Sequence, residues 1–448
     1  MSTTHNSIYC KNPVFLPRRL QRDWVFIPLE EPLSTYKELL VVDEMGKFLY
    51  DLCDGNHGVE QIVERVVKRF DISAEVANRD VGYFLAFLGQ KRILLLTTES
   101  VPQLVDLSKW VNELKILQRL PISVSFEITG KCDLRCIHCY VAGERPRREL
   151  KTAQLILIIN KLCEAGCLML HLTGGECTIR KDFVDVYLYA KQKGLLITIS
   201  TNATAFTHGI VQEMAKYPPR RVSVSLYGAE ASTYESITQK KGSFRSFVSG
   251  IELLRSYGIP LELKAVLLKE NVSGLGSMKA FAAKYGCQFR IYTGIVPGIY
   301  GELEPLSHQI SDDDLRRVAE HSVNIRAPYK TAIEYARESE DELFACNAGN
   351  TYFHIDCTGQ MHLCLLERAH GYSLLEGNVQ EGWAELESVR RTTLRMPDAC
   401  KGCTVIEFCH ICPPIANLVG KSRNSHAFIA QFCRLARLKA QINTCPVE

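Results

Sequence analysis

Short apolar runs and helix-like apolar spacing alternate in the first 120 residues. The runs at 25–27 and 39–42 predict short strands, and the apolar residues of 59–70 fall on one face of a helix. Ser73 has the position of an N-cap for a further helix, which extends to about Gln90. The other elements predicted here are a helix over 44–53 that stops at the turn pair Asp54-Gly55, a strand over 92–96 and a helical linker over 104–120. The pattern therefore predicts a small α+β unit.

From Ile122 the pattern changes to apolar runs that alternate with amphipathic segments. Predicted strands cover 123–128, 167–172, 195–200, 221–226, 261–267 and 288–292. Predicted helices between them cover 152–165, 182–193, 207–216, 244–257 and 275–285. Such alternation implies parallel strands joined by right-handed crossovers. The predicted fold class is therefore α/β with a partial (β/α)6 barrel, because a complete eight-fold barrel would need more chain.

The chain beyond the predicted barrel is less regular. A helix is expected over 312–321, within an otherwise irregular stretch at 298–340. From Cys346 onward the sequence is rich in cysteine and turns. This last segment is therefore expected to build little core without metal.

Composition and charge narrow the classes of function. The 448 residues carry a net charge of +3, without the basic excess that is typical of nucleic-acid binding. The polar N-terminus lacks the apolar core of a signal peptide, and no stretch is long and apolar enough to span a bilayer. We therefore expect a soluble cytoplasmic protein with no nucleic-acid or membrane partner. In that compartment disulfides are rare, so the clustering among its 18 cysteines indicates metal binding or redox chemistry.

Three cysteines lie within eight residues directly after the first predicted barrel strand. Cys132, Cys136 and Cys139 occupy a loop at the C-terminal end of that strand, where barrels place their chemistry. An iron–sulfur cubane held by only three thiolates has one iron that can take an external chelating ligand. Zinc is the alternative, but zinc sites usually show paired two-residue spacings and four ligands. His138 would have to be the fourth zinc ligand from an awkward position between two of the cysteines.

This cysteine spacing, followed by the aromatic Tyr140, resembles the signature of the radical S-adenosylmethionine (radical SAM) superfamily. The resemblance implies that the open iron binds the amino and carboxylate groups of S-adenosylmethionine. Reductive cleavage of that cofactor would give a 5′-deoxyadenosyl radical, which abstracts a hydrogen atom from the substrate. The resemblance also implies cofactor contacts by residues at successive strand ends: Gly174, Gly175 and Glu176 at the amino group, Ser200 and Asn202 at the ribose or carboxylate, Ser225 in a similar position, and the backbone of His138 near adenine.

A second group of cysteines resembles the SPASM extension of radical SAM enzymes, which carries two auxiliary iron–sulfur clusters. The resemblance assigns one cluster to Cys400, Cys403, Cys409 and Cys433, and the other to Cys346, Cys364 and Cys412. Cys357 is a candidate fourth ligand of the second cluster, which otherwise keeps an iron open to substrate. Two residues separate Cys409 from Cys412 where the SPASM pattern has three, a departure that affects the local geometry. Taken alone, Cys400, Cys403, Cys409 and Cys412 would also suit a zinc ribbon.

Most of the remaining cysteines are expected to be packed thiols. Cys177 is the exception, because it directly follows Glu176 and is expected to face the active cavity.

The N-terminal unit, with strands followed by three predicted helices over 21–100, resembles a PqqD-like peptide-recognition domain. Such domains are small winged-helix folds, and the resemblance implies that an extended leader peptide adds to the edge of a small sheet. The alternative is a helical cap with no binding role. The expected domains are therefore a leader-recognition domain at 1–105, a radical SAM partial barrel at 106–310 and a SPASM domain at 311–448.

Together the three parts resemble a maturase of ribosomally made peptides. The resemblance implies that the core peptide enters the barrel, loses a hydrogen atom and closes into a carbon–sulfur thioether or a carbon–carbon crosslink. The implied cofactors are three [4Fe–4S] clusters and S-adenosylmethionine. The implied partners are a precursor peptide with its leader and an electron donor such as flavodoxin or ferredoxin. No catalytic acid or base can be assigned. The alternatives are a sulfatase-maturing or small-molecule radical SAM enzyme and a zinc-binding adaptor without activity.

Overall fold

The computed structural model divides the chain into two compact units, Met1–Leu120 and Pro121–Glu448. Each unit has an apolar core of its own. The structure describes residues 8–11, 15–20, 23–28, 40–96, 120–141, 149–320, 346–392, 394, 397, 400, 402–409, 411–420 and 425–444. The helical linker predicted over 104–120 and the predicted domain boundary after residue 105 lie outside these residues, apart from the linker's last position.

The first unit contains two small antiparallel sheets and three helices. The strand order is β2-β3-β4 in one sheet and β5-β1-β6 in the other. The strands are β1 (Ile8–Lys11), β2 (Phe15–Leu20), β3 (Asp23–Pro28), β4 (Leu40–Val42), β5 (Asp54–Gly58) and β6 (Leu94–Leu96). The helices are α1 (Glu44–Leu52), α2 (Val59–Phe70) and α3 (Ala74–Gln90). The three predicted helices and three predicted strands are thus present, with ends shifted by a few residues.

Local capping explains where two of these helices begin. The Asp43 carboxylate accepts a hydrogen bond from the backbone N–H of the third residue of α1 at 2.8 Å. Ser73 does the same for the third residue of α3 at 3.3 Å, as the sequence predicts. The apolar helix faces and the small sheets enclose a core in which the rings of Phe26 and Tyr50 lie 4.6 Å apart.

The turn predicted at Asp54-Gly55 is wrong, because these residues begin strand β5. This strand pairs antiparallel with β1, with Ile8 opposite Gly58. Residues 54–58 contain no apolar side chain, so the hydrophobic pattern carries no sign of a strand there. Its conformation depends on hydrogen bonding to a partner strand rather than on a buried face.

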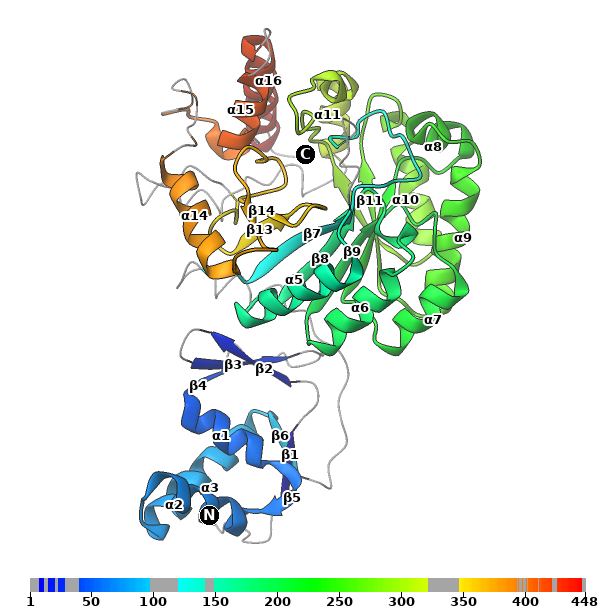
Figure 1. The fold of residues 1–448 in the computed structure, drawn as a ribbon. Helices are drawn as coiled ribbons and strands as arrows, with labels where there is room; N and C mark the ends of the chain where they lie inside the picture. Colours follow the sequence, from blue (N-terminus) through cyan, green and yellow to red (C-terminus); the bar gives the residue numbers. More distant parts are fainter. Residues whose placement is uncertain are drawn as a thin grey trace. The chain divides into compact units, whose positions relative to one another are not determined.

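The second unit is built on a nine-stranded sheet with the order β12-β11-β10-β9-β8-β7-β13-β14-β15 (Figure 1). Six strands pair in parallel throughout: β7 (Ser123–Thr129), β8 (Met169–Gly174), β9 (Leu196–Thr201), β10 (Arg221–Leu226), β11 (Leu261–Val266) and β12 (Gln288–Tyr292). The connecting helices are α5 (Thr152–Glu164), α6 (Phe183–Gln192), α7 (His208–Lys216), α8 (Ala231–Thr238), α9 (Ser243–Ser256) and α10 (Leu275–Lys284). The predicted partial (β/α)6 barrel is confirmed, and α8 is a helix that the sequence pattern did not indicate.

Strand β7 gives its two faces different roles. Val124, Phe126 and Ile128 are fully buried in the main apolar core. Because successive side chains of a strand point to opposite faces, Ser125 and Glu127 lie on the other side of the sheet. Both are nevertheless buried, at 4% and 8% exposure, so polar groups must be satisfied on that inner face.

The expectation that residues from Cys346 onward build little core is wrong. Strand β13 (Tyr352–Ile355) pairs in parallel with β7 and extends the barrel sheet. It is followed by β14 (Gln360–His362), β15 (Tyr372–Ser373) and α14 (Val379–Thr392). Phe353, Ile355 and Met361 are fully buried in the main core. The apolar residues of this segment are thus buried by the open edge of the barrel rather than by a core of their own.

The last described helices form a separate cluster in the second unit. Helices α15 (Pro413–Gly420) and α16 (Ser425–Thr444) supply most of this cluster's buried residues, which are Ile411, Ile415, Ala416, Val419 and Phe432. Cys400, Cys409 and Cys412 pack against it. The helix predicted at 312–321 is α11 (Asp312–Glu320), and residue 321 lies outside the described residues. None of the helices in the described part of the chain has the length and apolar character needed to cross a membrane.

Candidate functional site

The first cysteine loop leaves the end of β7 and is held by the end of helix α8. Cys132, Cys136 and Cys139 are half-buried. The backbone N–H groups of Arg135 and Ile137 donate to carbonyl oxygens in the last turn of α8, at 3.0 Å each. Burial, followed by the neighbouring thiols of Cys139 and Cys132, raises the pKa of Cys136 to about 12. The structure therefore places the three predicted ligands near enough for their thiols to influence one another, in surroundings that favour thiolates only when a cation is bound.

A polar network around Asp133 fixes the same loop from the side of β9 and α8. Its carboxylate accepts hydrogen bonds from Asn202 Nδ2 at 2.9 Å, Thr204 Oγ1 at 2.7 Å and Lys240 Nζ at 2.8 Å. The same Asn202 amide lies 4.0 Å from Cys132 Sγ. Asn202, predicted from the resemblance as a cofactor contact, thus also links the end of β9 to the cysteine loop. Sequence reasoning missed Asp133, which the spacing of the cysteines alone does not single out.

The Gly174-Gly175 pair packs directly on the backbone that leads into the cysteine loop. A Cβ on Gly174, whose φ is +139°, would lie 2.2 Å from Thr129 O, and one on Gly175 would lie 2.1 Å from Lys131 O. The backbone N–H of Gly175 donates to Thr129 O at 3.0 Å, and that of Glu176 donates to Lys131 O at 2.8 Å. Only glycine permits this approach. The motif therefore has a structural role in addition to any contact with a cofactor.

The Glu176 carboxylate is 1% exposed and joins the ends of β8 and β9. It accepts hydrogen bonds from Thr178 N at 3.1 Å, Thr178 Oγ1 at 2.6 Å, Thr201 Oγ1 at 2.7 Å and Asn202 N at 2.6 Å. Burial nevertheless raises the pKa of Glu176 above its usual value. Because its acceptors are occupied by groups of the chain, Glu176 is arranged to position Asn202.

The other predicted cofactor contacts lie at neighbouring strand ends. Ser200 Oγ is 2.7 Å from His171 Nε2, and burial lowers the pKa of His171 to about 3. The ring of His138 makes an edge contact with that of Tyr227, with centroids 5.0 Å apart. Burial also lowers the pKa of His138 to about 4, and its buried Nδ1 has no hydrogen-bond partner among the described residues. Ser225 hydrogen-bonds the Tyr227 side chain, whose pKa burial raises.

A cavity of about 170 Å³ opens beside the cysteine loop and the glycine pair. Its lining includes Glu127, Gly130, Gly174, Gly175, Cys357 and Arg368. Ile299 also lines it, and the Ile299 N–H donates to Tyr140 O at 2.9 Å at the end of the cysteine loop. The prediction that Cys177 faces this cavity is wrong, because Cys177 is fully buried in the main core with its Sγ 3.6 Å from Ser200 O.

The C-terminal cysteines influence one another electrostatically. Besides burial, the thiols of Cys364, Cys346 and Cys409 raise the pKa of Cys412. Burial, and then the thiols of Cys433, Cys400 and Cys403, raise the pKa of Cys409 to about 11. For Cys357, burial followed by the charges of Glu127 and Asp356 raises the pKa to about 12.

Within the described ranges, no three His, Cys, Asp or Glu side chains gather closely enough to hold a single metal ion.

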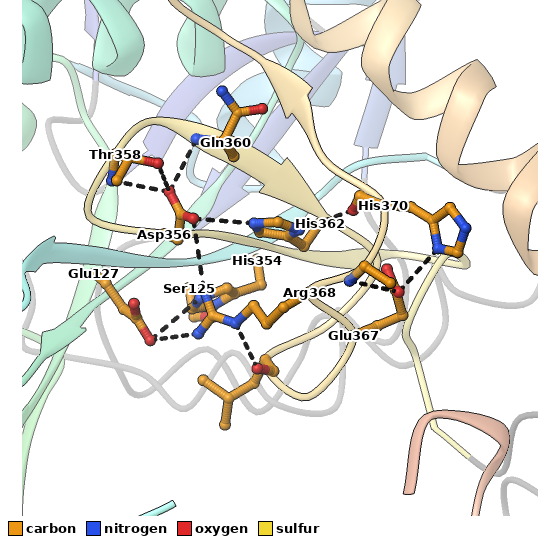
Figure 2. Close-up of polar contacts among 12 residues, drawn as sticks. Ser125, Glu127, His354, Asp356, Thr358, Gln360, His362, Glu367, Arg368 and His370 are labelled. Atoms are coloured by element: carbon orange, nitrogen blue, oxygen red, sulfur yellow. Dashed lines mark hydrogen bonds and ion pairs between the residues drawn. The ribbon is translucent and has the colours of Figure 1, made fainter. Parts of the chain in front are cut away.

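Polar residues from β7 and from the segment after β13 converge on one wall of the cavity (Figure 2). Arg368 NH2 donates to Glu127 Oε1 at 2.7 Å, and Asp356 Oδ2 lies 4.0 Å from Arg368 NH1. Burial opposes ionisation of Glu127, but His354 and Arg368 hold its pKa at about 2. Sequence reasoning missed this wall, although the polar Glu127 within an otherwise apolar strand was a usable signal.

Two family models match the chain. Residues 126–282 match the radical SAM superfamily, and residues 24–94 match the coenzyme PQQ synthesis protein D (PqqD) family. The chain therefore contains a radical SAM domain and a PqqD domain, as the resemblance implied.

The relatives and solved structures agree with this classification. The chain is 26% identical over 319 residues to the AdoMet-dependent heme synthase of Methanosarcina barkeri, covering 65% of this chain and 90% of that protein. It is 28% identical over 313 residues to the mycofactocin maturase MftC of Mycolicibacterium smegmatis, covering 64% and 77%. Among solved structures, Streptococcus suis SuiB bound to its precursor peptide SuiA aligns with a TM-score of 0.58 at 16% identity, covering 90% and 94%.

Proposed function

We propose that this protein is a maturase of a ribosomally made peptide and closes a carbon–sulfur or carbon–carbon crosslink within it. The observation that carries the proposal is the presence, in one chain, of a PqqD domain and a radical SAM barrel with a cavity beside the cysteine loop. Relatives named as maturases support it, as does the likeness in fold to SuiB, which was solved with its precursor peptide.

In this proposal Cys132, Cys136 and Cys139 hold a [4Fe–4S] cluster, and the donor set fits, because three clustered thiolates are the ligands that such clusters use. When bound, the cluster and S-adenosylmethionine supply a 5′-deoxyadenosyl radical that abstracts a hydrogen atom from the substrate. The chain's own contribution is to fix the loop through Asp133 and through the end of α8. An electron donor such as flavodoxin or ferredoxin would act as a further partner.

The cofactor contacts follow from the same strand ends. Gly174 and Gly175 line the cavity, which supports contact of their backbone with the cofactor's amino group. Glu176 would act through Asn202, which it holds in place. The further contacts proposed are Ser200 and Asn202 at the ribose or carboxylate, Ser225 nearby, and the backbone of His138 at adenine.

We further propose two auxiliary [4Fe–4S] clusters in the C-terminal region, which make three in all. The influence of Cys433, Cys400 and Cys403 on the pKa of Cys409 supports one set made of these four cysteines. The influence of Cys364 and Cys346 on the pKa of Cys412 supports a second set made of these three. Cys357, which lines the cavity, is the fourth ligand of the second set, or that cluster keeps an iron open to substrate.

The leader of the precursor would bind the N-terminal domain, proposed as residues 1–105, ahead of a barrel at 106–310 and a SPASM domain at 311–448. Strands β2, β4, β5 and β6 are edge strands of the two small sheets. An extended peptide can add to such an edge through backbone hydrogen bonds. This mode would leave the core peptide free to reach the barrel.

The test uses the full chain, reconstituted without oxygen, with reductant, S-adenosylmethionine and the small peptide encoded beside its gene. The expected result is a peptide lighter by two hydrogen atoms, together with 5′-deoxyadenosine. The triple variant C132A/C136A/C139A is the control and should form neither product. If the wild-type protein forms no more 5′-deoxyadenosine than this control, the proposal fails.

A small-molecule substrate is the second candidate. The identity to the AdoMet-dependent heme synthase, over 90% of that protein, favours it. The two candidates differ in what the full chain binds. Retention of the neighbouring peptide's leader at micromolar affinity supports peptide maturation, whereas 5′-deoxyadenosine formation without binding of that peptide supports the small-molecule reaction.

A further inference from the structure

Glu127 presents one carboxylate oxygen that the described part of the chain leaves without a hydrogen bond. Its Oε1 accepts from Arg368 NH2 at 2.7 Å and lies 3.4 Å from His354 Nε2. No hydrogen bond ends on Oε2 within the described residues, and Figure 2 shows this oxygen pointing away from both partners. The residue is 8% exposed and lines the cavity. A carboxylate oxygen that is open to the cavity can accept a hydrogen bond from a ligand there.

Arg368, on the same wall, presents hydrogen-bond donors that the described part of the chain leaves unused. Its Nε donates to Leu365 O at 2.9 Å and its NH2 donates to Glu127, so the guanidinium is held in one orientation. Its NH1 lies 4.0 Å from Asp356 Oδ2 and makes no hydrogen bond within the described residues. An arginine has five N–H donors, so NH1 has donors to offer. Its side chain is 11% exposed and lines the cavity.

The surroundings of the pair are rigid. Asp356 Oδ1 accepts from Thr358 N at 2.9 Å, Thr358 Oγ1 at 2.7 Å and Gln360 N at 3.0 Å, and its Oδ2 lies 3.1 Å from His362 Nε2. His354 is held on its other side by Ser125 Oγ, at 2.6 Å from Nδ1. Groups fixed in this way lose little entropy when a ligand binds.

The charges on this wall select the kind of ligand. Glu127 and Asp356 are both held ionised, and with the Arg368 guanidinium the three sum to −1. A free carboxylate or phosphate would face two carboxylates, and a free ammonium would face the guanidinium. A neutral group that offers one donor and one acceptor side by side matches both unused positions. One residue of an extended peptide is such a group, because its N–H and its C=O point to the same side of the strand, whereas those of a single trans amide point in opposite directions.

We propose that Glu127 and Arg368 clamp the backbone of one residue of the extended peptide substrate, whose N–H donates to Glu127 Oε2 and whose C=O accepts from Arg368 NH1. The inference rests on the proposed function and deepens it, because it names how the core peptide is held in the cavity that Gly174 and Gly175 also line. A backbone clamp is independent of side-chain identity. The selection of the precursor would then depend on the leader and not on this wall.

The test compares E127Q and R368Q with the control E262Q in the reconstituted full chain. Glu262 is also a buried carboxylate, 1% exposed and paired with Arg221 NH1 at 2.9 Å and Arg290 Nε at 2.6 Å, and it does not line the cavity. Loss of a charge-assisted hydrogen bond should lower kcat/KM for crosslinking of the neighbouring precursor by roughly 10- to 100-fold, mainly through KM. Leader affinity should stay within about twofold of wild type, and 5′-deoxyadenosine formation without peptide is measured alongside.

Two results overturn the inference. One is crosslinking by E127Q and R368Q at the wild-type kcat/KM. The other is a loss of peptide-free 5′-deoxyadenosine formation as large as the loss of crosslinking, which would assign the pair to the cofactor. Amide-to-ester substitutions along the core peptide add a readout that does not depend on the stability of a variant. One position should weaken turnover by wild-type protein but not by E127Q.

A probe that needs no precursor separates this inference from the proposed function. N-acetylglycine N-methylamide should bind the full chain with a dissociation constant on the order of millimolar, measured by ligand-observed NMR. Binding should be lost in E127Q and kept in E262Q. If wild-type protein crosslinks no peptide but binds this diamide through Glu127, the proposed function fails while the clamp stands. If E127Q binds the diamide as well as wild type does, the clamp fails.

Discussion

Replacing Gly175 by alanine should disable radical chemistry by moving the cysteine loop. The added Cβ would lie 2.1 Å from Lys131 O and 2.9 Å from Cys132 Cβ. Contacts under 3.0 Å essentially never occur, so the two backbone segments must separate by about 0.9 Å, the difference between 3.0 and 2.1 Å. Neither side can yield by rotating a flexible side chain, because the closest atoms belong to the backbone.

This displacement acts on the hydrogen bonds that join the two segments. The bonds Gly175 N to Thr129 O, at 3.0 Å, and Glu176 N to Lys131 O, at 2.8 Å, would stretch beyond useful length. Overpacking of this kind costs roughly 1–3 kcal/mol of stability. A displacement of about 1 Å near reacting groups can lower a rate by about 100-fold. We therefore expect a modest loss of stability and a much larger loss of activity.

The assay measures iron content, 5′-deoxyadenosine formation and the thermal midpoint of G175A after anaerobic reconstitution. The matched control is G276A in helix α10, where a Cβ meets nothing within 4 Å. The control should keep wild-type activity, and its free energy of unfolding should rise by about 0.5–1 kcal/mol, since alanine is the better helix former. G175A protein that loads iron and forms 5′-deoxyadenosine within twofold of wild type would refute the reasoning.

Three further predictions concern the supports of the site. Asp133→Ala removes the acceptor shared by Asn202 and its neighbours, so it should lower the free energy of unfolding, measured in urea, by about 1–3 kcal/mol and should reduce iron loading. Burial lowers the pKa of His171 to about 3, so the unfolded chain binds more protons between pH 6.5 and 3 and stability should fall as pH drops through that window. Thermal melts of H171Q, which can still bond Ser200, should depend less on pH between 6.5 and 4.5. Phe353→Ala should lower the free energy of unfolding of the second unit in denaturant by roughly 3–5 kcal/mol, because the ring is fully buried in the main core. A loss below about 1 kcal/mol would contradict this placement of the ring.

The barrel was predictable because its strands contain short apolar runs, which in β7, β10 and β11 are mostly buried. All six predicted barrel strands overlap observed ones, and 221–226 and 288–292 match at both ends. The short strands β1, β2 and β5 escaped prediction, since β5 has no apolar side chain at all. Strand β13 escaped because it gains its burial from a partner strand that is more than two hundred residues earlier in the chain.

The candidate site also contains some residues that the sequence predicts and others that only the fold reveals. The cysteine spacing and the Gly174-Gly175 pair are local in sequence, and they were visible because their chemistry depends on neighbours within a few residues. The pairing of Glu127 with Arg368 spans 241 residues and follows from no local pattern. Arg368 lies in an irregular stretch with no periodicity to place it. Only the fold brings the two side chains to one cavity.

The pairing of β13 with β7 explains why the cysteine-rich segment belongs to the same machinery as the barrel. Once Tyr352 aligns with Ser123, the parallel register carries Ile355 to the level of Phe126, next to Glu127. The chain then turns through Asp356 and Cys357, which line the cavity, and returns in β14. Cys346 and Cys364 flank this hairpin on either side, so any cluster they hold is tied to the wall that contains Arg368. Breaking the β7–β13 ladder should therefore disturb both the cavity wall that contains Arg368 and the C-terminal cysteines. Loss of one cysteine should leave this wall in place.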